Sequence, residues 1–276
     1  SSTVVKKILK DMDKDPKKYS YKAIRNKISS AKNELMEPED LAKFSTNDMD
    51  DLVVDVYKKY KEKLRTNNSV DFDDLLMLPI TLFRKYPEVL RFYQDRFKYI
   101  LIDEYQDTNE AQYLLTKMIS AKYKNICVVG DNDQSIYSFR GSNYKNILNF
   151  EKDYNNAKVI MLERNYRSTK QILDVANCII KKNTLRKDKN LWTDNESGEK
   201  VKYHRAENEK DEAFYVKCQI EELKKTEKLS EIAVLYRTNA QSRNMEEALL
   251  KENIPYKVIG SMYFYKRKEI KDLLSY

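Results

Sequence analysis

The stretch YILIDEYQDTN, residues 99–109, joins a short apolar run to a cluster of carboxylates. Residues 99–102 predict a buried strand that stops at Asp103 and Glu104, and Asp107 follows shortly after. In open α/β sheets, ligands bind beyond the carboxyl ends of the strands. An aspartate at such a strand end can hold Mg²⁺, and an adjacent carboxylate can orient or deprotonate an attacking water. The stretch therefore predicts a site for a magnesium-bound nucleotide.

Simpler interpretations exist for parts of this cluster. Asp107, with Glu110 following it, has the spacing of a cap for the next helix, and we expect that role for it. A cap does not account for Asp103 and Glu104. A metal-dependent nuclease built on Asp103, Glu104 and Asp107 is a further alternative. It is disfavoured because adjacent residues on a strand point to opposite faces and would not bind the same pair of metal ions.

A second predicted strand, residues 125–129, also runs into an acidic turn. If the two strands are neighbours, both turns open onto one crevice. The following segment, GDNDQSIYSFRGS at 130–142, interleaves aromatic and polar side chains, namely Gln134, Tyr137, Phe139 and Arg140. Aromatic residues interleaved with arginine are typical of single-stranded nucleic-acid binding, since bases stack on the rings. The alternative is that Tyr137 and Phe139 pack beneath the sheet.

The segment LERNYRST, residues 162–169, follows a third predicted strand in the same way. Here Arg164 and Arg167 flank Tyr166. An arginine that reaches across a cleft can neutralise charge on a transferring phosphate, and a tyrosine can lie against a nucleobase. The alternative is a surface arginine paired with Glu163, which fits Arg164 better than Arg167.

The segment YRTNAQSR, residues 236–243, repeats the pattern of a strand followed by an arginine and a helix. Arg237 and Asn239 lie just before the predicted helix. An arginine and an amide at a helix N-terminus suit a phosphate of a nucleic-acid backbone. This signal is weak when taken alone.

The periodicity along the chain changes near residue 97. Residues 1–96 predict helices throughout, with a kink or break at Pro79 and a helix beginning at Pro87. Beyond that point, predicted strands at 99–102, 125–129, 158–162 and 232–237 alternate with predicted helices at 109–120, 142–153, 169–183, 208–225 and 241–252. This alternation predicts an α/β fold with a parallel sheet covered on both faces. The segment 265–276 resembles the start of a helix, so we expect the chain to be part of a longer protein.

Composition excludes several classes of protein. The chain has 276 residues and a net charge of +8, which suits a polyanionic partner but also fits a lysine-rich surface. His204 is the single histidine and the three cysteines are far apart, so a histidine-based nucleophilic mechanism, a zinc site and a disulfide framework are all disfavoured. No apolar run approaches a membrane span, and a cytoplasmic location is expected. The four glycines form no phosphate-binding loop.

Taken in order, DEYQDTN, GDNDQSIYSFRGS, LERNYRST and AVLYRTNAQSR resemble the motifs of the UvrD/Rep/PcrA group of superfamily-one DNA helicases. The resemblance extends to ISSAKNEL, VDFDDLL and the last residues. It implies a motor that moves 3′ to 5′ along single-stranded DNA while hydrolysing ATP, with two RecA-like lobes of P-loop NTPase type. Residues 1–96 would be a helical insertion of the first lobe, 97–153 the second half of that lobe, and 154–276 the start of the second lobe.

The resemblance also assigns roles to individual residues. In the nucleotide site, Asp103 would bind Mg²⁺, Glu104 would activate water, Gln134 would sense the γ-phosphate, Arg167 would be the arginine finger and Tyr166 would stack on adenine. Single-stranded DNA and its junctions with duplex DNA would contact Phe72, Tyr137, Phe139, Arg140, Arg237 and Asn239. The family usually has Trp where Phe139 stands and more often Gln where Arg164 stands, and no role is assigned to Arg164.

The four motifs leave alternatives for the isolated chain. The phosphate loop and the second γ-phosphate arginine are not in this sequence, so these 276 residues alone should neither bind ATP tightly nor hydrolyse it. A non-enzymatic single-stranded DNA-binding module is therefore one alternative. A helicase subunit of a helicase–nuclease is another, and a downstream sequence would decide it.

Overall fold

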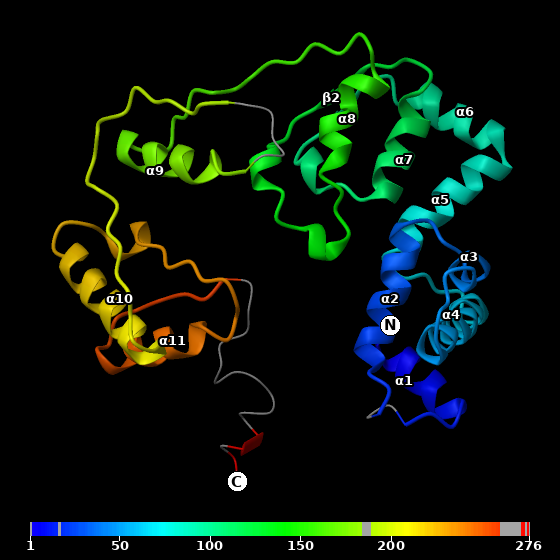
Figure 1. The fold of residues 1–276 in the computed structure, drawn as a ribbon, viewed down its shortest axis with the longest axis horizontal. Coiled ribbons are helices and arrows are strands. Elements are labelled where there is room, and N and C mark those ends of the chain that lie inside the picture. Colours follow the sequence, from blue (N-terminus) through cyan, green and yellow to red (C-terminus); the bar gives the residue numbers. More distant parts are fainter. Residues whose placement is uncertain (1, 16–17, 184–188, 260–271, 274, 276) are drawn as a thin grey trace. The chain divides into compact units, whose positions relative to one another are not determined.

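The computed structural model describes residues 2–15, 18–183, 189–259, 272–273 and 275. The chain divides into two compact units, Ser1–Gly198 and Glu199–Tyr276 (Figure 1). The predicted domain boundaries after residues 96 and 153 both fall inside the first unit and stay predictions. The predicted helix at 265–276 lies largely outside the described residues.

The first unit begins with the predicted helical block. Its helices are α1 (Ser2–Asp11), α2 (Tyr21–Asn33), α3 (Pro38–Ala42), α4 (Asp48–Thr66), α5 (Asp74–Lys85) and α6 (Pro87–Arg96). Pro87 occupies the first turn of α6, as predicted. Of the kink or break expected at Pro79, the break is wrong, because α5 continues through it, and the kink stays a prediction. Met77, Ile80 and Phe83 are buried on both sides of the proline, and this packing outweighs its cost of about 3 kcal/mol in a helix interior.

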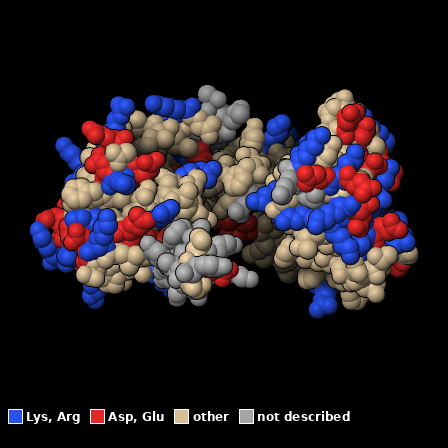
Figure 2. Space-filling view, turned by 90° about the horizontal axis from the view of Figure 1, so that it is seen from below, with Lys and Arg blue, Asp and Glu red and all other residues tan. Residues whose placement is uncertain are grey.

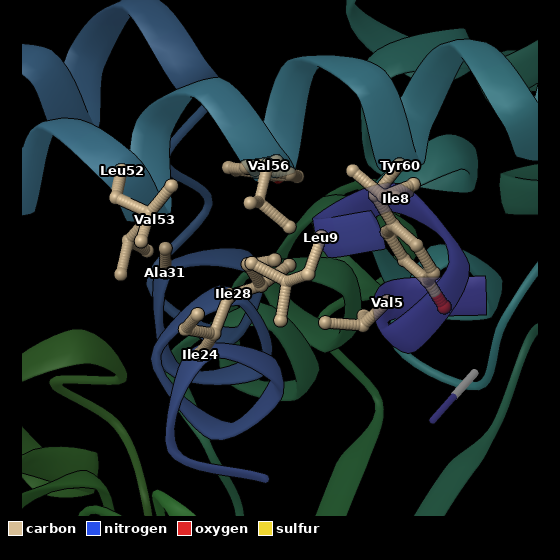
Figure 3. Close-up of a cluster of buried hydrophobic side chains, with 11 residues drawn as sticks. Val5, Ile8, Leu9, Ile24, Ile28, Ala31, Leu52, Val53, Val56 and Tyr60 are labelled. Atoms are coloured by element: carbon tan, nitrogen blue, oxygen red, sulfur yellow. The ribbon is translucent and has the colours of Figure 1, made fainter. Parts of the chain in front are cut away.

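The core of this block lies between α1, α2 and α4 (Figure 3). The three helices direct apolar side chains at one another, including Leu9 from α1, Ile28 from α2 and Val56 from α4. Ser20 and Asn47 accept hydrogen bonds from the first-turn N–H groups of α2 and α4, so each helix begins where a polar cap precedes an apolar stripe. The block is therefore a rigid base for the loops that leave it.

After residue 97 the chain forms a parallel strand pair. The strands β1 (Ile100–Ile102) and β2 (Ile126–Val128) pair in parallel with Leu101 opposite Cys127, and α7 (Glu110–Ser120) connects them. The predicted strands at 99–102 and 125–129 and the helix at 109–120 are thus confirmed. The predicted covering of both faces is wrong for this pair, since Leu101 is 78% exposed and nothing among the described residues packs over it.

Two further strand predictions are wrong in the described chain. Residues 158–162 and 232–237 have no regular ladder, and only Arg164 forms an isolated bridge, with Trp192. A short apolar run becomes a strand only when a neighbouring strand supplies hydrogen bonds, and these runs have none. The helices around them are confirmed with shifted ends, as α8 (Lys145–Asp153), α9 (Lys170–Ile180), α10 (Glu209–Leu223) and α11 (Ser242–Lys251).

In the second unit, α10 and α11 pack together around Ile220, Leu249 and Ile254. Over the described residues of the whole chain, none of the helices has both the length and the apolar character needed to cross a bilayer. The surface seen in Figure 2 carries lysine and arginine interspersed with aspartate and glutamate rather than a single basic patch.

Candidate functional site

The turn after β1 has an unusual backbone. Asp103 and Glu104 follow the strand directly and both are exposed. Glu104 has φ 51° and ψ 43°, in the left-handed region that residues other than glycine rarely adopt. Its N–H donates to Asp103 Oδ1 at 2.9 Å. Such strained residues cluster at functional sites, where the surrounding structure holds them in place.

Gln106 provides that support, and nothing in the sequence pattern singled it out. Its side chain is buried in the short 3₁₀ helix η1 (Tyr105–Asp107). Nε2 donates to Glu104 Oε2 at 2.8 Å, and Oε1 accepts from the Asp131 N–H at 2.9 Å. One amide therefore ties the acidic turn after β1 to the acidic turn after β2, which confirms that the two turns adjoin.

Gly130 makes this connection possible because it leaves room for the amide. A Cβ at position 130 would lie 2.5 Å from Gln106 Oε1 and 2.8 Å from Ile147 Cδ1. Neighbouring backbone adds to the fit, since the Tyr105 N–H donates to the Val129 carbonyl at 2.9 Å. Gly130 therefore allows the two turns to pack closely against each other.

The capping role predicted for Asp107 is wrong. Asn109 caps α7 instead, in a reciprocal pair with Gln112. Asp107 Oδ1 is buried and has no hydrogen-bond partner among the described residues. Burial, followed by the negative charge of Glu104, raises the pKa of the Asp107 carboxyl. Asp107 therefore belongs with the carboxylates of the acidic turn.

These carboxylates border a shallow hollow of ≈ 360 Å³, which is lined by Ile102, Asp103, Glu104, Asp107, Thr108, Gln112, Leu115 and Thr116. Among the described residues, no three His, Cys, Asp or Glu side chains are grouped to hold a metal ion by themselves. Mg²⁺ in nucleotide sites is usually held by one or two carboxylates together with phosphates and water. The exposed Asp103 and the unpartnered oxygen of Asp107 fit that kind of site.

Gln134 lies beside the second acidic turn. It ends the 3₁₀ helix η2 (Asn132–Gln134), and its Nε2 donates to Asp131 Oδ2 at 2.9 Å. Lys189 forms an ion pair with the same carboxylate. Burial alone would raise the pKa of Asp131, but the hydrogen bonds from Lys189 and Gln134 hold it below its ordinary value. Asp131 therefore links Gln134 to the turn that Gln106 supports.

The aromatic residues of 130–142 are accessible. The rings of Tyr137 and Phe139 lie 6.0 Å apart, and Phe139 is 66% exposed. The alternative in which both pack beneath the sheet is therefore wrong for Phe139. Arg140 ends the 3₁₀ helix η3 (Ser138–Arg140), and its side chain lies outside the described part.

Arg164 stacks against Tyr166 at the next predicted motif. Its guanidinium carbon lies 4.9 Å from the centre of the Tyr166 ring and 5.5 Å from that of Trp192. Nη2 pairs with Asp194 Oδ2 at 2.6 Å, so the predicted partner Glu163 is wrong. This contact was missed because Trp192 and Asp194 are distant in sequence.

Four of the predicted residues are exposed, two of them in the first unit and two in the second. Arg167 is exposed, and no described hydrogen bond or ion pair joins it to Asp103 or Glu104. In the second unit, Arg237 and Asn239 are exposed in the turn before α11. Gln241 Oε1 accepts from the Arg237 N–H at 3.0 Å and shapes that turn. Phe72, in the turn before α5, is 89% exposed.

Two helicase family models match consecutive parts of the chain. Residues 1–155 match the UvrD/REP helicase N-terminal domain, and residues 160–276 match the UvrD-like helicase C-terminal domain. The chain is 55% identical over 276 residues to the ATP-dependent DNA helicase PcrA of Bacillus subtilis, with 99% of this chain and 37% of that protein covered. It is 52% identical over 275 residues to the protein of the same name from Staphylococcus epidermidis strain RP62A, covering 99% of this chain and 38% of that protein.

The chain thus spans a little over a third of the length of the curated relatives it matches. UvrD-like helicase domains have RecA-like folds of the P-loop NTPase type, so the predicted α/β class is confirmed. The two matched domains meet between residues 155 and 160, just after α8. The chain belongs to the UvrD/REP helicase family.

Proposed function

We propose that this chain forms part of an ATP-dependent helicase that moves 3′ to 5′ along single-stranded DNA. The observation that carries the proposal is the bond network of Gln106, which joins the acidic turns of two neighbouring parallel strands. Ligands of open α/β sheets bind at this edge. Relatives that are named ATP-dependent DNA helicases are 55% and 52% identical to this chain over 99% of its length.

In this proposal the side chains of the acidic turn after β1 carry out ATP hydrolysis. Asp103 binds Mg²⁺, which supplies positive charge to the phosphates and orients them. Glu104 orients or deprotonates the attacking water, and the hydrogen bond from Gln106 holds one of its carboxylate oxygens in place. Gln134 senses the γ-phosphate. It lies beside the second acidic turn, where its side chain donates a hydrogen bond to Asp131.

The motif around Tyr166 completes the nucleotide site. Tyr166 stacks on adenine with one face of its ring, while Arg164 lies over the ring and limits its rotation. Arg167 approaches the γ-phosphate as the arginine finger when the lobes close. Such an arginine is worth on the order of 10³ to 10⁵ in rate, so closure would couple ATP turnover to motion.

Single-stranded DNA, including its junctions with duplex DNA, binds through exposed aromatic and polar side chains. Phe72, Tyr137 and Phe139 are accessible for stacking on bases. Arg140, Arg237 and Asn239 contact the DNA backbone, where arginine and amide groups position a protein without reading sequence. This division of contacts suits a motor that must move over any sequence.

The decisive test is Glu104→Gln in a full-length protein that contains these residues. DNA-stimulated ATP turnover should fall by at least about 10²-fold, the scale of losing a general base, while DNA binding is retained. Glu110→Gln, on the exposed first turn of α7, is the matched control and should leave turnover unchanged. Unchanged turnover in Glu104→Gln would rule out the assigned role of the acidic turn.

A second candidate applies to the 276 residues in isolation. Because the sequence has no phosphate-binding glycine loop, we propose that the isolated chain binds single-stranded DNA without hydrolysing ATP. Magnesium-dependent ATP turnover by the isolated chain, stimulated by DNA, would contradict this. We also propose that the protein acts on chromosomal DNA in the cytoplasm, in DNA repair or replication.

A further inference from the structure

A buried lysine lies beneath the most exposed aromatic residue of the proposed DNA-binding set. Lys32, near the end of α2, is only 2% exposed. Its Nζ contacts Asp71 Oδ2 at 2.7 Å and Asp74 Oδ1 at 2.8 Å. These two aspartates lie on either side of Phe72, the residue that projects from the turn. A lysine is seldom buried unless its charge is fully paired, so this arrangement needs an explanation.

The turn itself carries three carboxylates, and all three are bound within the protein. Asp71 Oδ1 also accepts from the Asp74 N–H at 2.9 Å, and Asp74 Oδ2 accepts from the Asp71 N–H at 3.1 Å. Asp73 Oδ2 accepts from Ser29 Oγ of α2 at 2.7 Å. Binding these carboxylates to α2 leaves the apolar ring as the exposed feature of the turn.

The partner helix is well anchored. Ile28 and Ala31 of α2, which lie four residues and one residue before Lys32, are buried in the helical core (Figure 3). Tyr60 of α4 adds a second link, because its Oη donates to Asp71 Oδ2 at 3.0 Å and its ring lies 5.3 Å from Lys32 Nζ. The turn is therefore held from two helices of the same core.

We propose that Lys32 is a positioning residue for single-stranded DNA, which fixes the Phe72 turn against α2 so that its ring meets a base in one orientation. This inference rests on the proposed function, in which Phe72 contacts DNA. A ring held in advance loses less conformational freedom when a base stacks on it, so affinity rises without any new contact. Lys32 itself is too deeply buried to touch DNA.

The test measures binding of a labelled oligodeoxythymidylate to the full-length protein. Phe72→Ala should weaken binding about 5- to 150-fold, the loss of one stacked base. Lys32→Met should weaken it about 5-fold or more, and this effect should vanish in the Phe72→Ala background. The matched control is Lys27→Met, which removes an exposed ion pair with Asp50 from the same helix and should change binding little.

The outcomes separate this inference from the proposed function. If Phe72→Ala has no effect, the DNA contact itself is wrong and the inference falls with it. If Phe72→Ala weakens binding but Lys32→Met does not, or does so equally in the Phe72→Ala background, only the positioning role is overturned. Equal weakening by Lys27→Met would also overturn it.

A milder variant covers the case in which Lys32→Met does not fold. Ser29→Ala removes only the bond to Asp73 and leaves both ion pairs of Lys32 intact. It should weaken binding about 2- to 5-fold, the equivalent of one ordinary hydrogen bond, again only when Phe72 is present. Unchanged binding by a folded Ser29→Ala protein would overturn the inference.

Discussion

Gln106 donates a hydrogen bond from its buried amide to the carboxylate of Glu104, at 2.8 Å. The same amide accepts the N–H of Asp131 on the neighbouring turn. The residue proposed to activate water is thus held by a side chain that reaches the other strand end. A shift of about 1 Å in a catalytic group can cost on the order of 10²-fold in rate, so this support should be visible in turnover.

We therefore expect Gln106→Leu to lower DNA-stimulated ATP turnover of the full-length protein by about 10-fold or more. The change releases Glu104 and leaves the Asp131 N–H without its partner, which costs about 1–3 kcal/mol of stability. Steady-state ATPase assays and urea unfolding measure the two effects. Gln94→Leu is the control, since that side-chain amide also bonds to a distant segment, donating to the Met118 carbonyl, but away from the acidic turn. Wild-type turnover in Gln106→Leu would contradict the supporting role.

The sequence predicts this site only in outline. The apolar runs before Asp103 and Asp131 show where two strands end, and parallel pairing then brings the turns together. Gln106 was missed because its role depends on a contact across 25 residues, for which no local pattern exists. The left-handed conformation of Glu104 likewise has no sequence signal, since glutamate seldom adopts it.

Two other predictions, the cap of α7 and two of the strands, are wrong for different reasons. The cap was assigned to Asp107 on spacing, but Asn109 stands closer to the helix and Gln112 completes its reciprocal pair. The runs at 158–162 and 232–237 have strand composition, and composition cannot reveal whether a neighbouring strand exists. For Lys32 a signal was present, because it stands four residues after Ile28 on the buried face of α2.

The stability of the helical block should depend on pH through Asp71. Burial alone would raise its pKa, but the bond from Lys32 lowers it below the ordinary value of 3.8. A carboxyl with a lowered folded-state pKa contributes stability that is fully present above the unfolded pKa. That stability is lost as the pH falls through the folded pKa. Urea unfolding from pH 6 to pH 3 should show this loss below about pH 4.

Removing Lys32 tests whether its bond to Asp71 is what lowers the pKa of that carboxyl. At pH 7, Lys32→Met should destabilise the protein by about 3–5 kcal/mol, because two partly buried carboxylates lose their shared counter-charge. The stabilising contribution of the ionised Asp71 should also disappear, so less stability is lost on acidification. Adding Asp71→Asn and Asp74→Asn to Lys32→Met should recover part of the loss. If the pH profile of Lys32→Met follows that of the wild type, Asp71 is not the titrating group.

Arg164 should affect ATP binding through Tyr166. Its guanidinium lies over the exposed ring, and Asp194 holds it there. A cation–π contact at an exposed site is worth about 0.5–1 kcal/mol, so Arg164→Ala should raise the KM for ATP about 2- to 5-fold with little change in kcat. Arg243→Ala removes another exposed arginine–carboxylate pair, with Glu247, and serves as the control. A lower kcat at unchanged KM would instead point to a role in the chemical step.

Phe139 offers a test in which the protein should gain affinity. Its ring is 66% exposed beside Tyr137, so a larger ring can be added without displacing core side chains. Phe139→Trp enlarges the stacking face and should tighten binding of an oligodeoxythymidylate about 2- to 5-fold, while Phe139→Ala should weaken it about 5- to 150-fold. Phe44→Ala, at a ring with 65% exposure in the helical block, should leave binding unchanged. If Phe139→Ala binds as tightly as the wild type, this ring does not stack on a base, and the DNA path must run elsewhere.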